Sequence, residues 1–194
     1  MPALILASGS SIRRKMLEDA GVEFQVVRPD IDEEAEKEGK ASLEAIAKGL
    51  AEAKALAISR KQSGKWVIGS DSVVAVDGRL FSKPRDRQEA AEHLRFFSGK
   101  KMLLVSAAAL ALDGEVEWSH FGPAELEVRE LSDEFIESYL AAEWPEVAQT
   151  VGVFRMEGRG VQLFDKVAGG HFTILGMPLI PVLRQLRKRG LLPS

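Results

Sequence analysis

Apolar positions along the chain follow two kinds of spacing. Continuous or alternating apolar runs, the pattern of strands, occupy residues 3–7, 22–26, 66–76, 102–112, 116–128 and 161–167. Apolar residues three or four positions apart, the pattern of amphipathic helices, occupy residues 10–20, 42–57, 86–97, 132–140 and 178–189. These segments interleave, and Asp-Gly turns at 77–78 and 113–114 predict two hairpins. We therefore expect an α/β fold with a mixed central sheet flanked by helices.

The composition indicates one globular domain over residues 1–194. Hydrophobic residues make up 45% of the 194 positions and run through the whole length, which allows a real core and argues against disorder. A formal net charge of -3 does not favour stable binding to nucleic acid or to membranes. The first apolar run is too short for a signal peptide, and no run reaches the roughly 20 residues of a membrane helix. We expect a cytoplasmic protein.

The first candidate site is the strand-to-helix junction at residues 8–14, Ser8-Gly9-Ser10-Ser11-Ile12-Arg13-Arg14. Backbone N–H groups and the helix dipole favour an anion at such a junction, and the guanidinium fork of arginine matches phosphate oxygens. Two adjacent arginines in a first turn oppose the dipole, which an anionic ligand would compensate. A capped helix with two solvated arginines explains the same residues equally well.

Carboxylates supply the next candidates. Asp32 and Glu33 lie in an acidic stretch that we interpret as a loop, where paired carboxylates can hold Mg²⁺ or Mn²⁺; a solvated charge run is the simpler explanation. Asp71 lies inside the apolar run 66–76, beside Gly69 and two serines. A buried carboxylate costs free energy without a partner or a task, so we interpret Asp71 as a general base or metal ligand in preference to a structural residue. The chain has no cysteine and three histidines, which excludes thiolate sites and argues against zinc.

Two lysines and a late loop complete the candidates. Lys54 flanks the apolar face of its helix, where it either points into a cleft or snorkels at the edge of the core. Lys83 stands between a hairpin strand and a proline, which would hold its ammonium in place. In the glycine-punctuated loop 152–160, Phe154 could stack on a base and Glu157 could accept from base N–H groups. A plain connecting loop is the alternative.

Taken in order, these segments resemble the Maf family over nearly the whole chain. The resemblance rests on an ordered set of motifs: Leu6–Ser10 with Arg13-Arg14, Asp30–Glu33, Lys54, Gly69–Asp71, Asp77-Gly78, Lys83-Pro84, Ser98-Gly99, residues 152–160 and Leu175–Leu179. It implies a fold similar to the inosine-triphosphate pyrophosphatases, with two lobes around a cleft. It also implies hydrolysis of a nucleoside triphosphate to the monophosphate and diphosphate, a house-cleaning role in nucleotide metabolism, and a homodimer. The family's septum-formation name keeps open an alternative, a non-catalytic nucleotide-binding regulator of cell division.

Carried over residue by residue, the resemblance implies a complete set of roles. The triphosphate would be held by Arg13, Arg14, Lys54 and Lys83. A divalent metal, Mg²⁺ or Mn²⁺, would be held by Glu33 and Asp71, with Asp71 activating water. Further substrate contacts would come from Ser8, Ser10, Phe154 and Glu157.

The substrate expectation follows from how the chain departs from the family pattern. Ser11 stands where the family usually has proline and Ser82 where it has glycine, and neither change removes a charge. The branch that acts on dTTP and UTP typically has Asp-Thr in the strand motif and glutamine in the late loop. The branch that acts on 7-methyl-GTP has Asp-Gln there, with phenylalanine and glutamate in that loop. Ser72 after Asp71 fits neither branch, but Phe154 and Glu157 favour 7-methyl-GTP, with dTTP or UTP second.

Overall fold

The computed structural model describes residues 4–193 and divides the chain into two compact units. Unit 1 contains residues 4–72, 105–122 and 170–193, and unit 2 contains residues 73–104 and 123–169. The single domain expected over residues 1–194 stays a prediction, and Ala3 of the expected first strand lies outside the described residues.

Seven strands of the described chain form one mixed sheet, which confirms the α/β class with a mixed central sheet. Their order is β2 (Gln25–Val27), β1 (Leu4–Ala7), β3 (Trp66–Val76), β5 (Lys101–Leu112), β6 (Glu115–Val128) and β7 (Phe164–Gly169), with β4 (Arg79–Phe81) paired to β3. Strand β1 runs parallel to β2 and β3, whereas β4 and β7 run antiparallel to β3 and β6. The three long strands β3, β5 and β6 each pass from one unit into the other.

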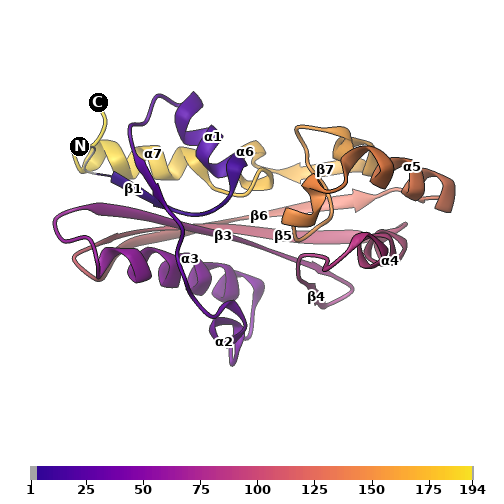
Figure 1. The fold of residues 1–194 in the computed structure, drawn as a ribbon, viewed down its shortest axis with the longest axis horizontal. Helices are drawn as coiled ribbons and strands as arrows, with labels where there is room; N and C mark the ends of the chain where they lie inside the picture. Colours follow the sequence, from indigo (N-terminus) through magenta and orange to yellow (C-terminus); the bar gives the residue numbers. More distant parts are fainter. Residues whose placement is uncertain (1–3, 194) are drawn as a thin grey trace. The chain divides into compact units, whose positions relative to one another are not determined.

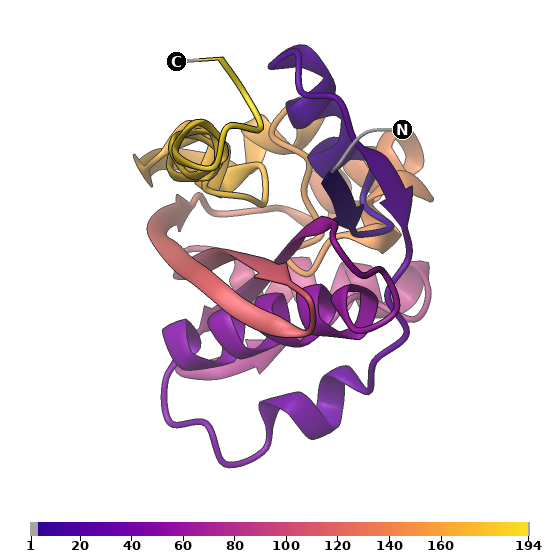
Figure 2. The same cartoon turned by 90° about the vertical axis from the view of Figure 1, so that its left-hand side faces the viewer.

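In unit 1, helices cover both faces of the sheet. Helices α1 (Ser11–Asp19) and α7 (Leu179–Lys188) lie on one face, and α3 (Leu43–Ser59) lies on the other (Figures 1 and 2). The short helices α2 (Glu33–Lys37) and α6 (His171–Ile174) complete the unit. The face under α1 and α7 is an apolar cluster from five elements, including Leu6, Leu17, Ile68, Leu110 and Val182. On the opposite face α3 approaches so closely that a side chain at Gly69 would lie 2.6 Å from the backbone nitrogen of Ala55.

Unit 2 is built on two helices packed against each other, α4 (Arg87–Phe97) and α5 (Asp133–Glu143). Two ion pairs link them, Arg95 with Asp133 at 2.6 Å and Arg87 with Glu137 at 2.9 Å. Two 3-10 helices, η1 (Glu146–Gln149) and η2 (Arg159–Leu163), follow α5 and lead into β7 (Figure 1).

Helix starts and turns form where the sequence predicts them. Ser10, Ser42, Asp86 and Ser132 each cap a helix by accepting a backbone N–H three residues ahead. Both Asp-Gly pairs adopt positive φ at both residues, which gives the turns that match strand twist. At the start of α4, Glu89 also accepts from the backbone N–H of Arg85, one residue before the cap Asp86.

Several sequence expectations differ from the structure. The strand expected at 22–26 begins only at Gln25 and is the short strand β2. The acidic stretch expected as a loop contains α2, because Asp32 accepts from the N–H groups of Glu34 and Ala35 and so caps a helical turn. The strand expected at 161–167 begins only at Phe164, after the 3-10 turn η2. Helix α6 was not predicted, because its 4 residues are too few to show a periodic pattern.

Within the described residues, every helix is too short or too polar to cross a lipid bilayer.

His93 of α4 gives the fold of unit 2 a dependence on pH. Its ring packs edge-on against Phe81 with centroids 5.0 Å apart, and its Nδ1 is buried without a hydrogen bond among the described residues. Burial lowers the pKa of His93 below its ordinary value of 6.5, although Glu89 opposes the shift. As pH falls below 6.5, the unfolded chain therefore takes up this proton before the folded chain does, and stability is lost.

We predict that His93→Phe weakens the loss of stability on acidification. The free energy of unfolding, measured by urea titration at pH 7.5 and pH 5.0, should fall less in the variant than in the wild type. The phenylalanine keeps the aromatic packing and cannot take up a proton. Equal pH dependence in the two proteins would contradict the assignment.

Candidate functional site

The centre of the candidate site is the polar segment of β3 in unit 1. Side chains alternate across a strand, so Ser70 and Ser72 share one face while Asp71 points to the other. All three lie within an otherwise apolar strand, and Asp71 is only 9% exposed. Gly69 precedes them and allows α3 to pack closely against the strand. The carboxylate therefore sits at the α3 face of β3, in surroundings that demand a charged partner.

Lys54 of α3 is that partner. Its Nζ lies 2.8 Å from Oδ1 of Asp71 and 2.7 Å from Oε1 of Glu33, so one ammonium joins two carboxylates. The lysine is 8% exposed, and it follows Leu50 and Ala51 on the buried side of the helix. Of the two positions that the sequence left open, the structure has Lys54 pointing inward to a carboxylate rather than snorkelling to solvent.

Glu33 forms the accessible end of this chain of charges. It is the first residue of α2, which Asp32 caps, and its side chain is 46% exposed. Asp71 and Lys54, in contrast, have side chains only 12% and 10% exposed. The cluster thus runs from a buried carboxylate, through an ammonium, to a carboxylate that solvent reaches.

Arg13 is buried on the other side of Asp71 and is bound mainly by protein oxygens. Its Nε donates to the carbonyl of Gly176 at 2.8 Å, its Nη1 to the carbonyl of Ser70 at 2.9 Å, and its Nη2 to Oγ of Ser72 at 3.1 Å. The same Nη2 lies 3.9 Å from Oδ1 of Asp71. Burial lowers the pKa of Arg13, and the negative charges of Asp71 and then Glu33 oppose that shift. The guanidinium therefore ties α1 to β3 and to the turn at Gly176.

A buried hydroxyl network behind β3 was missed by the sequence analysis. Oγ of Ser72 lies 2.8 Å from Oγ of Ser106, whose hydroxyl donates to the carbonyl of Thr173 at 2.7 Å. The carbonyl of Gly176 lies 3.2 Å from the hydroxyls of both Ser70 and Ser72. Ser106 stands alone as a polar residue in the apolar run 102–112, and this signal could have identified it. The network fixes the backbone on both sides of Asp71.

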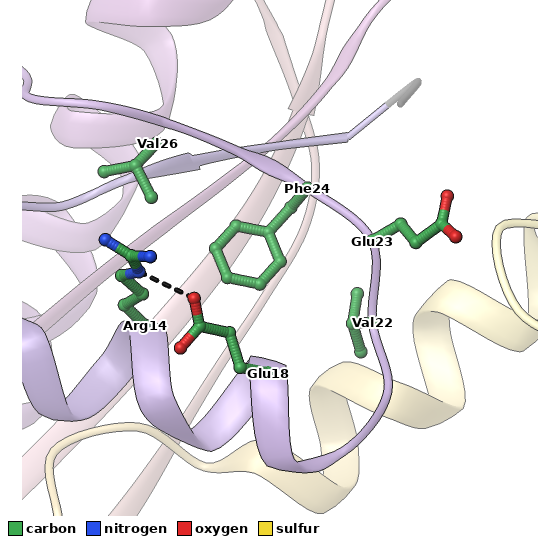
Figure 3. A pocket seen from close by; sticks show the side chains of 6 residues that line it. All are labelled: Arg14, Glu18, Val22, Glu23, Phe24 and Val26. Carbon is green, nitrogen blue, oxygen red and sulfur yellow. Dashed lines mark hydrogen bonds and ion pairs between the residues drawn. The ribbon is translucent and has the colours of Figure 1, made fainter. Parts of the chain in front are cut away.

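The strand-to-helix junction separates its two arginines. Ser8 accepts from the backbone N–H of Ser10 at 3.1 Å, and Ser10 caps α1. Arg14 is exposed and pairs with Glu18 at 2.7 Å, unlike its buried neighbour Arg13. Arg14 lies at a surface hollow of about 520 Å³. Figure 3 shows the side chains that line it: Arg14, Glu18, Val22, Glu23, Phe24 and Val26.

The remaining candidates lie in unit 2. Lys83 is exposed, two residues after the end of β4. Phe154 is 6% exposed and its ring packs edge-on against Phe164, with centroids 5.0 Å apart. Glu157 is exposed, and its Oε1 lies 3.4 Å from Nε of Arg155. Their convergence with the charged cluster of unit 1 stays a prediction.

A divalent cation fits the donor chemistry of Glu33 and Asp71 but would need further ligands. Across residues 4–193, no group of three or more histidine, aspartate or glutamate side chains is arranged to hold a metal. Two carboxylates nevertheless converge on one cationic group, the ammonium of Lys54. Mg²⁺ characteristically takes one or two carboxylates and completes its octahedron with water and substrate phosphates. The residues present match that pattern.

Comparisons with known proteins place this chain in a family. A nucleoside triphosphate pyrophosphatase of Sphingopyxis alaskensis is 46% identical over 98% of this chain and 99% of its own length. A 7-methyl-GTP pyrophosphatase of Rhizobium meliloti is 44% identical over 97% of each chain. Among solved structures, a nucleoside-triphosphatase described as a dITP/XTP pyrophosphatase, from Mycobacterium abscessus, is 24% identical with a TM-score of 0.40, over 66% of this chain and 74% of that one. The sequence profile of the family described as Maf-like protein matches residues 3–189, and the chain belongs to this family.

Proposed function

We propose that this protein is a nucleoside triphosphate pyrophosphatase that hydrolyses its substrate to a nucleoside monophosphate and diphosphate. The observation that carries the proposal is the junction at Lys54, where one buried ammonium holds Asp71 and the more exposed Glu33. The activities for which relatives at 44% and 46% identity are named support the same reaction.

Asp71 is the residue that we assign as general base. It would accept a proton from the water that attacks the phosphoanhydride, because it is the least exposed carboxylate of the cluster and its position is fixed by Lys54 and Arg13. Phosphoryl transfer depends mainly on positioning and on neutralising charge, so a rigid base beside two cationic groups suits this chemistry.

Four cationic side chains would hold the triphosphate, and they would contribute to different degrees. Most N–H donors of Arg13 already bind protein oxygens, so its main part is to fix Asp71. Lys54 offers its charge at the carboxylates, and the exposed Arg14 and Lys83 have side chains that solvent reaches. Ser8 and Ser10 shape the N-terminus of α1, whose backbone N–H groups suit an anion.

A divalent metal, Mg²⁺ or Mn²⁺, would be held by Glu33 and Asp71 together with phosphate oxygens. When bound, the metal would act as a Lewis acid: it would polarise the phosphate and reduce the repulsion between the negative phosphate oxygens and the lone pair of the attacking water. Without a metal, the ammonium of Lys54 keeps the carboxylates of Glu33 and Asp71 close together, so the protein itself positions these two metal ligands.

For the base, we propose 7-methyl-GTP as the preferred substrate and dTTP or UTP as the second. The exposed carboxylate of Glu157 suits the N–H donors of a guanine edge, and one close relative carries the name 7-methyl-GTP pyrophosphatase. Phe154 packs inside unit 2, so its part is to support the loop that carries Glu157. The homodimer and the cytoplasmic location stay predictions.

We predict that Asp71→Asn lowers kcat by at least about 10²-fold, the loss typical of a missing general base. Pyrophosphate and orthophosphate release are measured separately with 7-methyl-GTP, dTTP and UTP. The wild type should release pyrophosphate. Asp77→Asn is the matched control, because it makes the same change in an exposed Asp-Gly turn that tolerates Asn-Gly.

Retention of normal turnover in Asp71→Asn would overturn the assignment of the base. Nucleotide binding by the wild type without hydrolysis of any of the three substrates would instead favour the non-catalytic regulator.

We also predict that the chelator EDTA abolishes hydrolysis and that Mg²⁺ or Mn²⁺ restores it. Glu33→Gln should raise the metal concentration for half-maximal rate by at least about tenfold, because even groups outside the first ligand shell affect metal affinity by that much. Glu34→Gln, one position later on α2, is the control. A metal requirement that is identical in Glu33→Gln and wild type would exclude Glu33 as a ligand.

A further inference from the structure

Glu143 ends α5 in unit 2 and is buried, although no motif or resemblance marks it. Glu143 is only 7% exposed, whereas Glu146, three residues later, is exposed to solvent. A glutamate is rarely buried unless a partner holds its charge. The hydrogen-bond donor and the cation that face its carboxylate both come from the loop 152–160, the loop that carries Glu157.

Both oxygens of Glu143 face this loop. Oε1 accepts from the backbone N–H of Arg159 at 3.1 Å. Oε2 lies 3.6 Å from Nη1 of Arg155 and has no hydrogen bond among the described residues. The carboxylate thus holds the loop through one backbone bond and one ion pair.

The loop is shaped around this carboxylate. A Cβ at Gly158 would lie 3.1 Å from Oε2 and 3.2 Å from Oε1 of Glu143. A Cβ at Gly160 would lie 2.5 Å from the backbone nitrogen and oxygen of Arg155. The two glycines therefore permit the close approach of the loop to α5 and to itself.

A second residue of α5 holds the other end of the loop. Tyr139, one helical turn before Glu143, donates its hydroxyl to the carbonyl of Val153 at 2.9 Å. Val153 has φ 55, a conformation that a β-branched residue adopts only when its surroundings impose it. Tyr139 and Glu143 share one helix face and bind the loop at both ends.

Arg155 connects this support to Glu157. Its Nη1 faces Glu143, and its Nε lies 3.4 Å from Oε1 of Glu157, so one guanidinium is divided between two carboxylates. Counted as fully ionised, the three side chains carry a net charge of -1. An arginine released by Glu143 would pair with Glu157 more completely and would mask its charge.

We propose that Glu143 is a positioning residue for base recognition. It holds the loop 152–160 in place and shares Arg155 with Glu157, so that the guanidinium does not fully neutralise the carboxylate of Glu157 and negative charge remains for the base. This inference rests on the proposed function. A 7-methylated guanine carries a positive charge and N–H donors, so it benefits from that arrangement, whereas uracil gains less.

The test compares Glu143→Gln with the matched control Glu146→Gln. Glutamine keeps the shape and an acceptor for the N–H of Arg159, but it removes the charge that holds Arg155. We expect KM for 7-methyl-GTP to rise at least about fivefold, the scale of one typical hydrogen bond. We expect KM for UTP, and kcat for both, to change less than about twofold. Gly158→Ala, which leaves every charge in place and displaces the carboxylate, should give the same pattern.

Hydrogen–deuterium exchange without nucleotide provides a readout independent of activity. Amides of residues 152–160 should exchange faster in Glu143→Gln than in wild type or Glu146→Gln, while those of α3 stay unchanged. If the exchange of residues 152–160 is unchanged in both Glu143→Gln and Gly158→Ala, the positioning role is overturned. Equal losses for 7-methyl-GTP and UTP, or no change in KM for either, overturn the role in base recognition. If the wild type hydrolyses no nucleotide, the proposed function fails and the recognition role fails with it, while exchange still decides whether Glu143 holds the loop.

Discussion

Lys54 holds the candidate site together by offering one ammonium to two carboxylates. Burying Asp71 and Lys54 side by side requires the pair, because loss of either partner of a buried ion pair costs about 3–5 kcal/mol. Arg13 adds a second cation, and its bonds to Gly176, Ser70 and Ser72 make that cation part of the scaffold. The central carboxylate thus has a fixed position before any ligand binds, as phosphoryl chemistry favours.

The two arginines of the strand-to-helix junction show how one turn of helix serves two purposes. Arg13 points into unit 1 and donates its N–H groups to protein oxygens, whereas Arg14 lies at the surface and pairs with Glu18. In unit 2, Arg155 lies between two carboxylates, as Lys54 does in unit 1. In both units a buried charge acts on the position of a more exposed one, Asp71 on Glu33 through Lys54 and Glu143 on Glu157 through Arg155.

The sequence predicted the elements with long apolar patterns, the residues at which four helices begin and the two Asp-Gly turns. It also identified Asp71, because a carboxylate in an apolar strand is visible without a structure, and it placed Lys54 at the edge of a helix face. The sequence could not show that Lys54 joins Asp71 to Glu33, because the three residues come from separate elements. Thr173 and Glu143 were missed since their roles arise from tertiary contacts with residues distant in the sequence, whereas Ser106 was visible as the one polar residue of an apolar run. The short helices α2 and α6 escaped because a single turn has no period.

The most direct measurement is a crystal structure with Mn²⁺ and a nucleotide analogue whose α–β bridge resists hydrolysis. We predict an anomalous manganese peak at a site bound by Glu33 and Asp71, with the triphosphate beside Lys54. A nucleotide whose phosphates lie away from Lys54, with manganese bound elsewhere, would contradict it.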